Sequence, residues 1–219
     1  MHKNDYELNE KIHAIIINPY LSWDELNANC DLIQKYNIRN VSTSLNFLSH
    51  IKNALSNHKV NINTFISYPF ADVPVDFINE FVCYAKDAGA NGIEYTPNFL
   101  NLSRNNLNNF ANQIEIINAS ELPVTIIINK TKLHKELFEK AIEISIELGI
   151  TNFQFGDGFG APISNVDIVE ILKFIGNQNS IKIVGGIRKL SQVIDLFDSG
   201  IDCIGTSKFN EIFEEIRLI

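Results

Sequence analysis

The chain alternates eight times between a short apolar run and a longer amphipathic stretch, and this alternation limits its fold more than any other feature. The apolar runs are rich in Ile, Val and Phe and cover residues 12–17, 40–44, 61–67, 92–95, 124–129, 152–155, 181–184 and 202–205. Each run precedes a segment with helical periodicity, over residues 22–36, 46–57, 74–89, 103–119, 133–148, 165–176, 190–199 and 208–217. Such alternation is typical of βα units in a parallel sheet.

The expected helices carry start and stop signals. Ser22 and Glu25 have the spacing of a capping box at the start of the first segment. Three later segments end at Gly89, Gly149 and Gly200, each followed within two or three residues by the next apolar run. Glycine accepts the left-handed conformation that often closes a helix. The repeated junction supports a series of similar βα units.

We therefore predict an α/β fold that is a single (β/α)8 TIM barrel over residues 1–219. Eight units averaging about 27 residues match the lower size limit of such a barrel, with little room for further domains. No linker or low-complexity tract divides the chain. A flavodoxin-like doubly wound sheet is the competing fold, but it uses fewer strands and leaves roughly 50 residues unexplained.

Charge and hydropathy exclude several classes of partner. The 18 basic and 26 acidic residues give a net charge of −8, which disfavours binding to a phosphate backbone, so we expect no nucleic acid partner. No apolar run approaches the roughly 20 residues needed to span a bilayer, and the N-terminal residues are polar, so we expect neither membrane contact nor a leader. The chain is expected to be cytoplasmic.

Cysteine and histidine spacing gives no sign of a metal site. Cys30, Cys83 and Cys203 lie far apart and form no C-x-x-C pair, which suits a reducing compartment. The five histidines form none of the paired patterns that bind zinc. We therefore expect no metal and no cofactor.

Two charged residues lie inside expected strands. Lys182 is in the run 181–184 and Glu94 is in the run 92–95. An unpaired ammonium in the barrel interior is costly, so we predict that Lys182 contacts Glu94 there. The alternative is that either side chain lies at a strand end and reaches solvent.

Two glycine-containing loops follow the last two expected strands, and both are candidates for binding phosphate. The first contains Gly185, Gly186 and Arg188, and the second contains Gly205, Thr206 and Ser207. Barrels often bind phosphate at these loops, because glycine lets backbone N–H groups approach the oxygens. The alternative is that both are tight turns without a ligand. Asp157, in the loop after the sixth run, is expected to weaken anion binding.

These motifs together resemble the deoxyribose-phosphate aldolase family over nearly the whole chain. The stretch from Lys182 to Arg188 is similar to the family's strand-7 motif of Lys, two residues, Gly-Gly, Val or Ile, and Arg. Gly205 to Ser207 resembles its last phosphate loop, and Gly158 falls at its glycine-rich turn after strand 6. The resemblance implies a class I aldolase barrel that cleaves a sugar phosphate through a lysine Schiff base.

The chain departs from the family at the position of that lysine. Gln154 stands where the family has the Schiff-base lysine on strand 6, and an amide nitrogen cannot form an imine. The family's strand-4 aspartate becomes Glu94, and Asp157 replaces a threonine near the phosphate. Lys182 matches the family's second lysine, whose charge acts on the first. Lys130, after the fifth run, is a further candidate for acid–base work.

Two functional hypotheses follow from the sequence. The first is an aldolase-like enzyme for a small carbonyl compound or sugar phosphate, with weak or altered activity, in which Lys182, Glu94, Gln154 and Lys130 form the catalytic set. The second is an inactive barrel that binds a ligand or partner. An epimerase of sugar phosphates is a third alternative by fold analogy alone. The sequence leaves the oligomeric state open, with a homodimer as one possible assembly.

Overall fold

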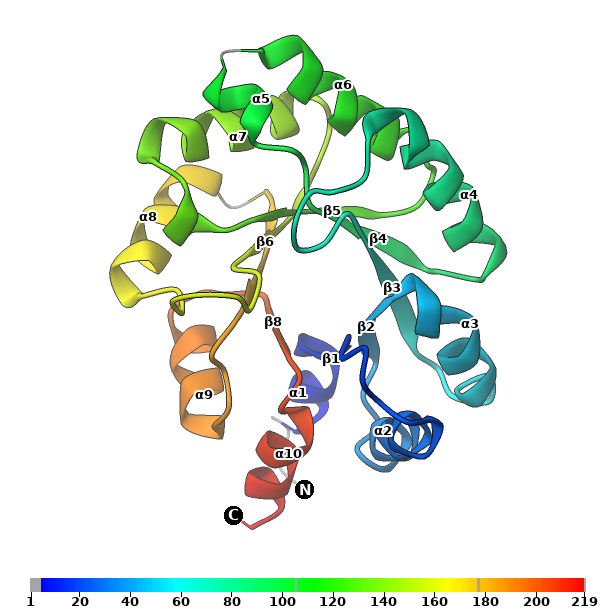
Figure 1. Ribbon diagram of the computed structural model, residues 1–219. Coiled ribbons are helices and arrows are strands. Elements are labelled where there is room, and N and C mark those ends of the chain that lie inside the picture. The colour runs from blue at the N-terminus through cyan, green and yellow to red at the C-terminus, as the bar shows by residue number, and fades with distance from the viewer. Residues whose placement is uncertain (1–4, 105, 177, 219) are drawn as a thin grey trace.

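A closed barrel of eight parallel strands forms the centre of the molecule, with helices around it (Figure 1). The computed structural model describes residues 5–104, 106–176 and 178–218. The strands pair in sequence order, and β8 closes on β1 through the register pair His13 and Gly205. The predicted (β/α)8 barrel is confirmed, and the flavodoxin-like alternative is wrong because an open sheet has no such closing pair.

The strands agree with the expected runs to within one residue at each end. They are β1 Ile12–Ile16, β2 Asn40–Ser44, β3 Asn61–Ile66, β4 Gly92–Tyr95, β5 Val124–Ile128, β6 Asn152–Phe155, β7 Ser180–Val184 and β8 Cys203–Thr206.

The helices follow the strands as predicted, with three additions. They are α1 Asp5–Lys11, α2 Trp23–Lys35, α3 Leu45–Ala54, η1 Val75–Phe77, α4 Ile78–Asp87, α5 Leu100–Ser103, α6 Leu107–Asn118, η2 Lys130–Lys132, α7 Lys135–Glu147, α8 Asn165–Ile175, α9 Leu190–Asp198 and α10 Phe209–Arg217. The sequence did not predict α1, α5 or η2. Ser22 caps α2 through the reciprocal bonds of a capping box with Glu25.

Alternate strand residues face the helices or the barrel interior. The residues that face the helices form one continuous apolar core with the helices, as Ile126, Phe153 and Ile183 illustrate. The inward positions form a separate and more polar set. Ile15, Phe65, Ile127 and Val184 make a small second apolar cluster there. Because successive side chains point to opposite faces, each strand adds one interior layer for every two residues.

None of the helices in the described ranges combines the length and the apolar character that crossing a membrane would require.

Candidate active site

Lys182 and Glu94 form an ion pair inside the barrel. Lys182 Nζ lies 2.7 Å from Glu94 Oε1, and the two side chains are only 4% and 1% exposed. The interior contact predicted from the sequence is therefore present. The alternative in which either side chain reaches solvent is wrong, because β7 and β4 hold both charges in the middle of the barrel.

Polar neighbours from β2 and β3 complete this cluster. Ser42 Oγ donates to Glu94 Oε1 over 2.7 Å and accepts from Lys182 Nζ over 3.1 Å. Asn63 Nδ2 donates to the same carboxylate oxygen over 3.3 Å. We call Lys182, Glu94, Ser42 and Asn63 the polar centre. A buried charge needs such partners, since the penalty for removing it from water is several kcal/mol.

Two further interior groups stay uncharged beside the polar centre. Burial, together with the nearby Lys182 charge, holds the pKa of His13 well below its ordinary value. Burial raises the pKa of the Cys203 thiol to about 12, although Lys182 acts in the opposite direction. The interior therefore holds one compensated charge pair next to a neutral imidazole and a neutral thiol.

Gln154 lies next to this pair on β6, where it is fully buried. It is the register partner of Lys182 across the β6–β7 ladder. Its Nε2 donates to the Gly156 carbonyl over 3.1 Å, which fixes the side-chain amide against its own strand end. Its Oε1 is buried without a hydrogen-bond partner among the described residues.

The ammonium of Lys130 lies against helices α7 and α8. Its Nζ lies 3.1 Å from Glu170 Oε2 and 3.9 Å from Asp167 Oδ1, both in α8. The same ammonium sits 5.1 Å from the ring centre of Phe138 in α7. These contacts hold the charge among the helices. Lys130 is the first residue of η2, two residues after β5 ends, and its catalytic role stays a prediction.

Four apolar side chains separate the polar centre from the barrel mouth. Ile15, Phe65, Ile127 and Val184 each face inward, and Ile15, Phe65 and Val184 follow His13, Asn63 and Lys182 by two residues. They form the next layer toward the carboxyl ends of the strands. We call them the apolar floor. All four are at most 6% exposed, so the polar centre is covered on this side.

Gly205 is required for this close packing. A Cβ atom there would lie 2.8 Å from Ile15 Cδ1, 2.8 Å from Val184 Cγ2 and 2.9 Å from Lys182 Cε. Any side chain would displace the floor or the lysine beneath it. The packing gives Gly205 a structural role besides its predicted place in a phosphate loop.

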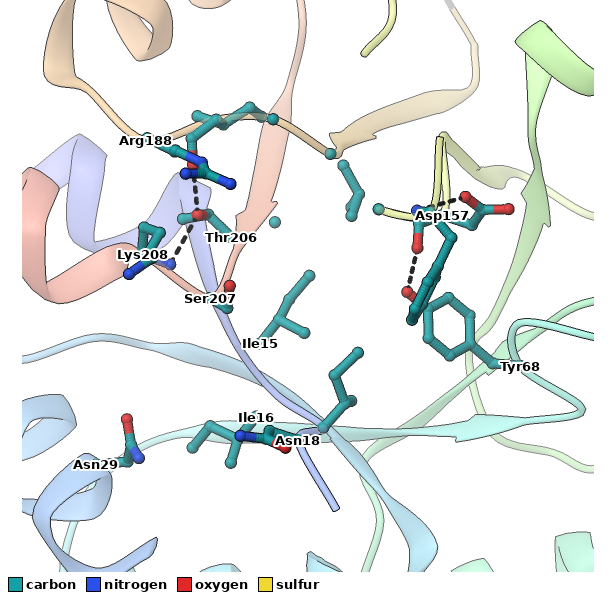
Figure 2. Close-up of a pocket in the computed structure, with 18 of the residues that line it drawn as sticks. Ile15, Ile16, Asn18, Asn29, Tyr68, Asp157, Arg188, Thr206, Ser207 and Lys208 are labelled. Carbon is teal, nitrogen blue, oxygen red and sulfur yellow. Dashed lines mark hydrogen bonds between the residues drawn. The ribbon is translucent and has the colours of Figure 1, made fainter. Parts of the chain in front are cut away.

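A cavity of about 560 Å³ opens above the floor, and we call it the mouth cavity (Figure 2). Ile15 and Val184 line its base, whereas Lys182, Glu94 and Gln154 are not among the described residues that line it. All the predicted phosphate-loop residues line it, namely Gly158, Gly185, Gly186, Arg188, Gly205, Thr206 and Ser207. The structure thus brings three glycine loops together around one cavity, and it adds Lys208, which the sequence analysis missed.

Thr206 connects two of these loops through its hydroxyl. Its Oγ1 donates to the Ile187 carbonyl over 2.7 Å and accepts from Lys208 N over 2.9 Å. Because the hydroxyl proton is already donated, this side chain positions the loops and is not free to donate to an anion. The phosphate-binding role of Thr206 stays a prediction.

The carboxylate of Asp157 is compensated by two neighbours, and its effect on anion binding stays a prediction. Asp157 Oδ2 lies 2.7 Å from Lys132 Nζ, and Oδ1 accepts from Phe159 N over 2.9 Å. In Figure 2 the carboxylate lies across the cavity from Arg188 and Thr206. Its charge is therefore offset and turned from the basic side of the mouth.

Tyr68 joins the Asp157 loop to β3. Its hydroxyl donates to the Asp157 carbonyl, and its ring stacks on Phe65 at 4.3 Å between centres. Burial first, and then the charges of Asp157 and Glu94, raise the pKa of Tyr68. The phenol therefore stays protonated and holds the two loops together at neutral pH.

Within the described ranges, His, Cys, Asp and Glu form no group of three that could hold a metal ion.

Curated relatives of this chain are deoxyribose-phosphate aldolases. The enzyme of Dictyoglomus turgidum is 28% identical over 207 residues, which cover 93% of this chain and 94% of the relative. That of Mycoplasmoides pirum is 26% identical over 202 residues, covering 89% of this chain and 90% of the relative. No protein-family model matches the chain.

Solved structures show the same fold. An aldolase described as QR15 superposes with a TM-score of 0.89 at 21% identity, covering 96% of each chain. A tetrameric deoxyribose phosphate aldolase from Aeropyrum pernix gives 0.86 at 15% identity, covering all of this chain and 94% of the other. The relatives support the family resemblance seen in the glycine loops: the chain is similar in sequence to deoxyribose-phosphate aldolases, and its fold is a (β/α)8 barrel.

Proposed function

We propose that this chain is an aldolase-like protein that takes a small carbonyl compound or sugar phosphate at the mouth cavity, with weak or altered Schiff-base chemistry. The observation that carries the proposal is the pairing of Gln154 with Lys182 across β6 and β7. This places an amide beside the interior lysine, at the position where the resemblance leads us to expect a second amine.

The glycine loops after β7 and β8 are the proposed site for the anionic end of the ligand. Arg188 and Lys208 bring positive charge to this side of the cavity, and α10 begins directly after it at Phe209. A helix N-terminus favours an anion. The start of α9 is less available, because the N–H groups of Arg188 and Lys189 donate to Gln192 and that of Leu190 donates to Glu215.

Imine formation at Lys182 faces two obstacles. The reaction needs a neutral amine that attacks the carbonyl carbon and expels water. The Lys182 nitrogen is held in an ion pair with Glu94, and the apolar floor covers the lysine from the mouth. Gln154 offers no replacement, because its nitrogen lone pair is delocalised into the amide. Weak activity is therefore expected from the native chain.

Borohydride reduction in the presence of acetaldehyde tests the proposal, with intact mass and peptide mapping as the readout. The native chain should give at most a trace of adduct. Gln154→Lys should give an adduct at the substituted position, and Gln154→Met, which has similar length without an amine, should give none there. Abundant adduct on Lys182 or Lys130 of the native chain, with ordinary aldol cleavage of 2-deoxyribose 5-phosphate, would overturn it. If the native chain, Gln154→Lys and Gln154→Met all form no adduct, the result would favour an inactive barrel that only binds a ligand or partner.

Assembly and location are further parts of this proposal. The tetramer described for the Aeropyrum pernix neighbour supports self-association, and we propose a homodimer as the simplest form. The three cysteines are free, which supports a reducing cytoplasmic location. Sedimentation of the purified chain tests the first point, and fractionation of cells that express it tests the second.

A further inference from the structure

A second and larger cavity, of about 940 Å³, lies beside the mouth cavity. Aromatic side chains from several segments line it, among them Tyr20, Phe70, Phe81, Tyr84 and Phe159. We call it the aromatic cavity. Tyr20 is 90% exposed and Phe70 is 76% exposed, although aromatic side chains of this size usually contribute most when buried. The position of these rings therefore calls for a role other than core packing.

The two cavities share a boundary. Ile17, Pro19, Tyr68 and Phe159 line both of them. The ring centre of Phe159 lies 6.1 Å from that of Tyr68 and 6.3 Å from that of Phe70, so one run of aromatic contacts leads from the mouth cavity into the aromatic cavity. A single elongated ligand can therefore contact both.

The charges of the two cavities differ in sign. Arg188 and Lys208 line the mouth cavity, where Asp157 is compensated by Lys132. The described residues that line the aromatic cavity include the exposed carboxylates of Asp72 and Glu80 but no lysine or arginine. An anion is favoured in the first cavity and disfavoured in the second, whereas a neutral or cationic apolar group is favoured in the second.

We propose that one ligand occupies both cavities: its phosphate lies in the mouth cavity, and the aromatic cavity binds an apolar group of that ligand that carries no negative charge. The inference rests on the proposed function and narrows its substrate class to phosphates that carry an aryl or alkyl extension. The volume is within the range of small-molecule pockets. Concavity and continuity with the mouth cavity favour a small ligand over a second copy of the chain, which would need a broader complementary face.

Binding of three probes to the full chain tests the proposal by isothermal calorimetry, independently of any aldol chemistry. The probes are inorganic phosphate, 3-phenylpropyl phosphate and 3-phenylpropan-1-ol. Burying a phenyl ring should make 3-phenylpropyl phosphate bind about tenfold or more tightly than inorganic phosphate. Phe70→Ser and Tyr84→Ala should remove most of this gain and leave inorganic phosphate binding unchanged. Phe77→Ser is the matched control, because Phe77 is 49% exposed but outside the residues given for this cavity.

Equal affinity for inorganic phosphate and 3-phenylpropyl phosphate would overturn the proposal, as would a gain that Phe77→Ser removes as fully as Tyr84→Ala. Dissociation of an oligomer by Phe70→Ser, seen by sedimentation, would instead assign the surface to a second copy and also overturn it. Failure of inorganic phosphate alone to bind would count against the proposed function. Binding of 3-phenylpropan-1-ol, lost in Tyr84→Ala, would in that case still support the aromatic cavity.

Discussion

Replacing Glu94 by Gln should destabilise the chain strongly, because it leaves the Lys182 ammonium in the barrel interior without a counter-charge. At 2.7 Å and an effective dielectric constant of about 20, the Coulomb attraction of the pair is about 6 kcal/mol. Desolvation offsets much of this, so the pair itself adds little, but removing one partner of a buried pair typically costs about 3–5 kcal/mol. Urea unfolding followed by circular dichroism measures the loss.

Two comparisons make this test specific. The double variant Glu94→Gln with Lys182→Met removes both charges at similar volume and should recover most of the lost stability. The exposed pair Lys208–Glu211 has the same 2.7 Å separation, and Glu211→Gln should cost only about 0.5 kcal/mol or less. A loss below about 1 kcal/mol for Glu94→Gln, or a double variant no more stable than the single one, would contradict a buried ion pair.

Three further predictions concern the floor, the interior and the mouth. Gly205→Ala should lower the free energy of unfolding by about 1–3 kcal/mol through overpacking against the apolar floor, measured by urea unfolding. Because the pKa of His13 is lowered on folding, the unfolded chain binds a proton below about pH 6.5 that the folded chain does not. Stability should therefore fall as pH drops below that value, by up to about 1.4 kcal/mol per unit until the folded pKa is reached, and His13→Asn should remove that part of the slope. Lys132→Met should weaken phosphate binding about fivefold in calorimetry by leaving Asp157 unpaired, and adding Asp157→Asn should restore it; no change in the single variant would count against the compensation described for Asp157.

The barrel could be predicted because local and global patterns agree along most of the chain. Short β-branched runs, helix-closing glycines such as Gly149 and the capping box at Ser22 all indicate the same βα order. The elements that were missed lack these signals. The residues of α1 show no apolar periodicity, and α5 (Leu100–Ser103) precedes the helix expected over 103–119, which forms only from Leu107 as α6.

The candidate site was predictable where a buried charge demanded a partner, and less so elsewhere. Lys182 and Glu94 meet because each occupies an interior position on its strand. Lys130 is also charged, but its position after a strand does not tell which side chains its ammonium contacts. Its partners in α8, Asp167 and Glu170, lie far along the chain. The floor was missed because Ile15 and Val184 look like ordinary strand residues, although counting two positions from Lys182 identifies Val184.

The apolar floor divides the barrel interior into two parts along the barrel axis, one above the floor and one below it. Ligand recognition depends on loops above Ile15, Phe65, Ile127 and Val184, whereas the charged cluster below them depends on strand interiors. Except at Gly205, which lines the mouth and packs on both the floor and Lys182, substitutions on one side need not disturb the other, because a layer of close-packed side chains lies between them. A protein engineer could therefore change the preferred ligand of this chain and the reactivity of its interior in separate steps, and combine the results afterwards.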